Sequence, residues 1–154
     1  SGGILTLLFL AFAVLMGMSL SFILLVYTSA SVFKTFAVTT IMFGVMAVTG
    51  YTTKTDLTKF GSIMMMGLIG LMVAMLINFF MQSAAMDYII SIIGVLIFTG
   101  LTAYDVQRLK KIGSGAGEYG TENVRKLSIL GALTLYLDFI NLFLFLLRFM
   151  GDRK

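Results

Sequence analysis

The chain contains no histidine and no cysteine in its 154 residues. These two absences exclude disulfides, metal sites built from thiolate or imidazole ligands, and hydrolases that use a Ser-His-Asp or Cys-His arrangement. Proline is also absent, so any kink or break within a helix has to rely on glycine, serine or threonine. Charged residues make up only 12% of the chain, against roughly 25% in a soluble domain. The available chemistry therefore rests on a few carboxyl, amide and hydroxyl groups.

Apolar residues dominate what remains, at 59% of the chain and a mean hydropathy of +1.03. They occur in runs of about 17 to 25 residues, the length that crosses a hydrocarbon core about 30 Å thick. In lipid such runs must be helices, because a barrel would need shorter, alternating segments. The sequence predicts an all-α, polytopic transmembrane helix bundle. It forms a single domain, residues 1–154, with spans at 3–27, 35–51, 61–81, 88–105 and 127–149.

Basic residues are concentrated in two of the predicted loops. Loop 52–60 contains Lys54 and Lys59, and loop 106–126 contains five more Lys and Arg residues. If the spans alternate, these loops share one side of the membrane, which the positive-inside rule makes the cytoplasm. The odd number of spans then places the C-terminus outside. No basic region or cleavage site precedes the first run, so we expect a span there and not a signal peptide.

Two acidic residues lie inside the apolar runs. Asp105 is near the end of the fourth run, and Asp138 is in the middle of the fifth, roughly 16 Å along the helix from its start. A carboxylate in hydrocarbon is costly and usually faces a partner, a cavity or a transport path. Asp138 shares a helix face with Thr134 and Asn141, and Asp105 shares one with Thr102. These polar stripes indicate a site inside the bundle.

Both aspartates also have a purely structural interpretation. Asp105 lies three residues before Arg108, a spacing that suits a solvated ion pair at a helix end. Asp138 could hydrogen-bond to another helix. A third acid, Asp87, precedes the fourth span at a position typical of a helix N-cap.

If Asp105 and Asp138 meet, their electrostatics are clear. Two adjacent carboxylates cannot both ionise cheaply, so they share a proton and titrate as a unit. The pair joins its two helices while protonated and repels, or recruits a cation, once both groups are charged. Calcium takes about six to eight oxygen ligands. The candidate cation-binding or pore-lining residues are Asp105, Asp138, Thr134, Asn141 and Thr102. This pattern predicts a proton sensor and a weak calcium site, with no tightly bound cofactor.

One motif points to nucleotides, but its context does not. Residues 115–120 read GAGEYG and match the G-x-G-x-x-G fingerprint. That fingerprint requires a preceding strand, whereas a membrane span and a basic loop precede it here. The net charge of +4 belongs to loops that set topology. We therefore expect neither nucleotide nor nucleic acid as a partner.

Three stretches resemble the Bax inhibitor-1 family, also known as the transmembrane Bax-inhibitor-motif proteins, in a bacterial inner-membrane form. They read GMSLSFILLVYTSASVFKTFAVTTIMFGVMAVTGYTTKTDLTKFG, LTAYDVQRLKK and LGALTLYLDFINLFLFLLRFMG. The resemblance implies seven spans, of which this chain corresponds to the last five. It also implies an aspartate pair, here Asp105 and Asp138, that acts as a pH-responsive element in a calcium leak. An arginine on the family's second helix, which can pair with the aspartates, has no counterpart here.

Three functions stay open at this point. The favoured one is a pH-sensitive calcium or cation leak channel or transporter. The alternative is a non-conducting regulator that binds a membrane protease or another membrane partner, a role that the resemblance implies for some bacterial relatives. An intramembrane aspartyl protease is disfavoured, because its second motif needs Gly-x-Gly-Asp where this chain has Leu135-Tyr136-Leu137-Asp138. We predict an integral protein of the bacterial inner membrane that is not an enzyme, with its oligomeric state left open.

Overall fold

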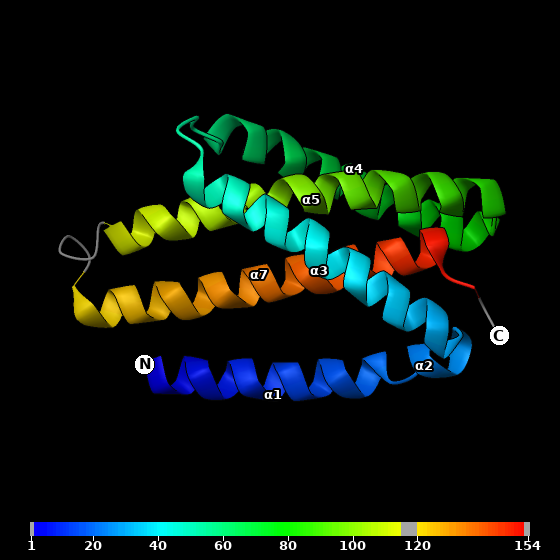
Figure 1. Cartoon of the computed structure of the whole chain (residues 1–154), viewed down its shortest axis with the longest axis horizontal. Helices are drawn as coiled ribbons and strands as arrows, with labels where there is room; N and C mark the ends of the chain where they lie inside the picture. Colours follow the sequence, from blue (N-terminus) through cyan, green and yellow to red (C-terminus); the bar gives the residue numbers. More distant parts are fainter. Residues whose placement is uncertain (1, 115–119, 153–154) are drawn as a thin grey trace.

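The computed structural model describes residues 2–114 and 120–152, and every regular element within them is helical. The helices lie along the long axis of the bundle (Figure 1). In order, they are α1 (Gly2–Leu20), α2 (Ile23–Val26), α3 (Ser29–Thr52), α4 (Thr58–Met81), α5 (Ala84–Ser114) and α7 (Thr121–Met150). Five segments of the described chain are long and apolar enough to cross a membrane. The predicted all-α transmembrane bundle is therefore confirmed.

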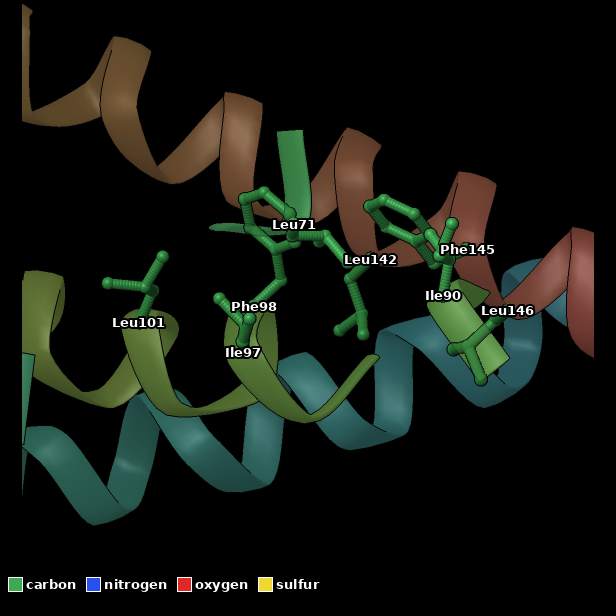
Figure 2. Close-up of a cluster of buried hydrophobic side chains, with 8 residues drawn as sticks. All are labelled: Leu71, Ile90, Ile97, Phe98, Leu101, Leu142, Phe145 and Leu146. Atoms are coloured by element: carbon green, nitrogen blue, oxygen red, sulfur yellow. The ribbon is translucent and has the colours of Figure 1, made fainter. Parts of the chain in front are cut away.

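Helices α5 and α7 form the centre of the bundle. They are the most buried of the five spans, whereas α1 is the least buried. Figure 2 shows the main apolar cluster, which α4, α5 and α7 build together: Leu71, Ile90, Ile97, Phe98, Leu101, Leu142, Phe145 and Leu146. The rings of Phe98 and Phe145 stack with centroids 5.8 Å apart. Small residues permit this closeness, since a Cβ on Gly94 would lie 2.6 Å from the Phe145 ring.

The first predicted span is interrupted. Helix α1 ends at Leu20, and the short helix α2 begins at Ile23. At the break the Ser21 hydroxyl donates to the Met18 carbonyl at 2.6 Å, and the Phe22 N–H bonds three residues back instead of four. Because the chain has no proline, the interruption relies on a serine that competes for backbone groups.

The second and fourth spans begin earlier than predicted. Thr28 caps α3 by accepting a hydrogen bond from the Ser31 N–H at 3.1 Å. Lys34, which the hydropathy pattern left outside the span, therefore lies within α3. The hydroxyl of Ser83 accepts from the Met86 N–H at 3.2 Å, so Asp87 lies in the first turn of α5 and is not its N-cap.

The predicted loop 106–126 is wrong in most of its length. Helix α5 continues to Ser114, and α7 already begins at Thr121. Only residues 115–120 connect them, and 115–119, with most of the GAGEYG motif, fall outside the described residues. Hydropathy marks only the part of a helix that lies in hydrocarbon, whereas backbone hydrogen bonds continue beyond it. Asp105 is consequently far from the end of its helix.

Candidate aspartate-pair site

The carboxyl groups of Asp105 and Asp138 are direct neighbours across the contact between α5 and α7. The Asp105 carboxyl lies within hydrogen-bonding reach of the Asp138 carboxyl. Asp138 is only 4% exposed, and Asp105 is half-buried. The Oδ2 atom of Asp138 is buried and has no hydrogen-bond donor among the described residues. Since a carboxylate can only accept, a bond between the two groups requires a proton on one of them.

An apolar groove of about 730 Å³ gives access to this pair. Helices α4 and α7 both pack on α5 and make little contact with each other, which leaves α5 as the floor. The wall that α4 contributes is entirely apolar and consists of Met65, Leu68, Leu71, Met72 and Met75. The polar groups of the groove lie on α5 and α7. The site therefore has one apolar and one polar wall.

Two further predicted residues line the same groove. Thr134 and Asn141 lie on α7, one helical turn on either side of Asp138. The Thr134 hydroxyl donates to the Leu130 carbonyl at 2.9 Å, which leaves its oxygen lone pairs available. These side chains and both aspartates form one oxygen-rich patch.

Thr102 does not join this patch. Its side chain is fully buried, and its hydroxyl donates to the Phe98 carbonyl at 2.8 Å. It does not line the groove. A step of three residues rotates a side chain by about 60° around a helix. Here this rotation turns the threonine away from the groove and into the packed interior.

Sequence reasoning missed two other residues of the groove, Tyr104 and Arg108. The spacing of Arg108 from Asp105 predicts only an ion pair at a helix end. The structure does not form that pair, because no contact within 4.0 Å joins the two charged groups in the described chain. Instead, Arg108 lines the groove and also a small adjoining cavity of about 30 Å³ beside Asp105 and Gly131.

The donor set is of the kind that calcium prefers, but it is small. Two carboxylates, one amide and one hydroxyl oxygen are fewer than the roughly six to eight ligands of a calcium site. No cluster of three or more His, Cys, Asp or Glu side chains exists within residues 2–114 and 120–152. Any further ligands would have to be water or backbone carbonyls. The arrangement suits a weakly held cation.

The fold and the site define a polytopic α-helical integral membrane protein with an acidic pair at its centre. A family model described as "Inhibitor of apoptosis-promoting Bax1" matches the whole chain, residues 1–154. The chain belongs to the Bax inhibitor-1 family.

Bacterial relatives are similar to the chain over nearly all of its length. The inner membrane protein YbhL of Escherichia coli strain K12 is 53% identical over 154 residues, which are 100% of this chain and 66% of YbhL. An uncharacterised protein of Borreliella burgdorferi is 50% identical over 97% of the chain and 64% of its own length. An uncharacterised protein of Rickettsia prowazekii is 48% identical over 96% of the chain and 61% of its own length. The chain thus spans less than two thirds of the length of these relatives.

Proposed function

We propose that this chain contributes to a pH-sensitive leak pathway for calcium or another cation, with Asp105 and Asp138 as its proton sensor and cation ligands. One observation carries the proposal: the two carboxyl groups meet within a groove of the helix bundle whose α4 wall is entirely apolar. An intramembrane acid of this kind is by default a functional group.

The proton changes what the pair does to its helices. A single shared proton lets one carboxyl donate to the other, which joins α5 to α7. When both groups are charged, they repel each other by about 4 kcal/mol at 4 Å with an effective dielectric constant near 20. A bound cation removes this repulsion. Loss of the proton therefore favours either separation of the helices or entry of a cation.

Few other charges act on the pair. Helix α5 presents Tyr104 and Arg108 to the groove, and α7 presents the neutral side chains of Thr134 and Asn141. The groove residues on α4 are all apolar. Arg108 is exposed and forms no ion pair in the described chain. The charged residues that line the groove are thus the two aspartates and this arginine.

Calcium flux from liposomes tests the proposal. The wild-type chain is expected to give a flux that changes with pH. The Asp138→Asn variant keeps the shape of the side chain but cannot ionise, so its flux should lose most of the pH dependence. Asp87→Asn is the matched control, because Asp87 is an acid on α5 that pairs with Arg148 away from the groove. Equal pH dependence in wild type and Asp138→Asn would refute the proposal.

A second candidate function is a non-conducting regulator that binds a membrane-bound protease. The apolar wall of α4 favours it, since a groove between two transmembrane helices can receive side chains of another helix. Absence of flux in the wild type, with protease binding intact in an Asp105→Asn/Asp138→Asn variant, would support this alternative. We propose no catalytic step for the pair, because Leu135-Tyr136-Leu137 replaces the glycine motif of intramembrane aspartyl proteases.

A further inference from the structure

A buried glutamine holds the connection between α3 and α4 against α5. Gln107 is only 7% exposed. Its Oε1 accepts from the Leu57 N–H at 2.8 Å, and its Nε2 donates to the Thr55 carbonyl at 2.7 Å. One side-chain amide thus satisfies a donor and an acceptor of the 53–57 backbone, as a neighbouring strand would. The loop depends on this amide because these backbone groups have no helical partner.

Two lysines strengthen the same contact. The Lys110 ammonium donates to the Tyr51 carbonyl at 2.7 Å and lies 4.6 Å from the centroid of the Tyr51 ring. Lys111 pairs with Asp56 at 3.0 Å. With Gln107 they occupy positions i, i+3 and i+4 of α5, which share one helix face. This loop-facing side of α5 consists of Gln107, Lys110 and Lys111.

The opposite side of α5 carries the candidate site. Residues of a helix are about 100° apart, so Gln107 lies about 200° around the axis from Asp105. The side chains on the Asp105 side are Arg108, Leu109 and Ile112, and they line the cavity against α7. The same short segment of α5 is therefore bonded to the 53–57 loop on one side and faces Asp138 on the other.

Glycines on α3 and α4 allow these helices to approach this segment of α5 closely. A Cβ on Gly50 of α3 would overlap the backbone of Ala103, and one on Gly61 of α4 would overlap the ring of Tyr104. These contacts set the distance of α5 from α3 and α4, but a helix held at a fixed distance can still rotate. Hydrogen bonds with defined directions, such as those of Gln107, oppose rotation.

We propose that Gln107 is a positioning residue. By bonding the 53–57 loop to the loop-facing side of α5, it fixes the rotation of this helix and so directs the Asp105 side chain toward Asp138. The inference rests on the aspartate pair of the proposed function. It assigns no contact between Gln107 and a transported ion, since the amide acts only through the helix.

Cross-linking measures this geometry without relying on flux. The chain has no native cysteine, so Asp105→Cys with Asp138→Cys gives the full chain in liposomes a single reactive pair. We expect a short bifunctional thiol reagent to link the pair rapidly. Adding Gln107→Met, which keeps the length of the side chain but removes both hydrogen bonds, should slow the linking several-fold. Lys111→Met, which breaks an exposed ion pair of the same contact and neither hydrogen bond of Gln107, should slow it much less.

A second cysteine pair distinguishes a change in the direction of the Asp105 side chain from a general loss of bundle stability. Asp87→Cys with Arg148→Cys links the same two helices at their other ends, where the native side chains form an ion pair. Its cross-linking should be insensitive to Gln107→Met. If Gln107→Met leaves the cross-linking rate of the 105–138 pair unchanged, the inference is overturned. It is also overturned if Gln107→Met lowers the cross-linking rates of both pairs equally. An equal effect of Lys111→Met would overturn the assignment to Gln107.

Flux then separates this inference from the proposed function. Where the wild type conducts, Gln107→Met should flatten the pH profile of calcium flux, and an unaltered profile would count against the positioning role. A wild type without flux would refute the proposed function. The cross-linking result would still decide the role of Gln107.

Discussion

Gly50 of α3 lies so close to Ala103 of α5 that a Cβ on the glycine would overlap the Ala103 carbonyl oxygen. Both residues are buried. The contact is two residues before Asp105, so it sets the separation of α3 and α5 beside the candidate site. In a membrane, helices gain little from the hydrophobic effect, and close backbone approach at small residues is a main source of association.

Gly50→Ala should therefore destabilise the bundle. The added methyl group must push α3 away from α5, and overpacking of this kind typically costs about 1–3 kcal/mol. Gly44→Ala in the same helix is the matched control, because nothing lies within 4 Å of its Cβ position. The control should be neutral or gain about 0.5–1 kcal/mol from helix propensity. Unfolding in detergent, followed by circular dichroism, measures both; equal stabilities would show that the α3–α5 contact is adaptable.

Exchanging the charges of Asp87 and Arg148 should not restore the full stability of the bundle. Asp87 lies in the first turn of α5 and Arg148 in the last turn of α7, so each charge also interacts favourably with the dipole of its own helix. Neutralising either residue should cost about 0.2–1 kcal/mol, as expected for a partly exposed pair. The swapped variant, Asp87→Arg with Arg148→Asp, restores the pair but reverses both dipole interactions. It should therefore stay less stable than wild type in a double-mutant cycle; full recovery would argue against a dipole contribution.

Asp56 should make the 53–57 loop sensitive to acid. Hydrogen bonds from the Thr58 hydroxyl and backbone N–H, together with Lys111, lower the pKa of Asp56 from 3.8 to about 2. Since the pKa is depressed in the folded state, the ionised form stabilises the fold. This contribution is complete above the unfolded pKa and is lost as the pH falls through the folded pKa.

The stability difference between wild type and Asp56→Asn should accordingly be constant near neutral pH. It should shrink between about pH 4 and pH 2, as the carboxylate is protonated. Thermal unfolding midpoints over this range measure it. Thr58→Val, which removes the hydroxyl donor, should move the loss to a higher pH. A difference that persists below pH 2 would exclude ionisation as its cause.

Topology can be tested with single cysteines. The α3–α4 loop and the end of α7 lie at opposite ends of the bundle (Figure 1). From the basic loops we expect the former in the cytoplasm and the latter outside. An impermeant thiol reagent added to intact cells should thus label Asp152→Cys. It should label Lys54→Cys only after permeabilisation, and the reverse pattern would invert the proposed orientation.

Much of the fold could be predicted because it depends on local composition. Runs of apolar residues without proline specify helices of membrane length, and the five spans follow. Helix boundaries were less predictable. They depend on caps such as Thr28 and on helix that continues beyond the apolar run, as α5 does after Asp105.

The sequence by itself determined that Asp105 and Asp138 are exceptional, since a carboxyl group within an apolar helix is costly wherever that helix packs. Only the tertiary structure decided that the two groups face each other, that Thr102 turns away and that Gln107 binds a loop about fifty positions earlier. Spacing along one helix gives relative angles, whereas the direction in which a face points is set by contacts with distant segments. In this bundle those contacts come from Gly50, Gly61 and the 53–57 loop.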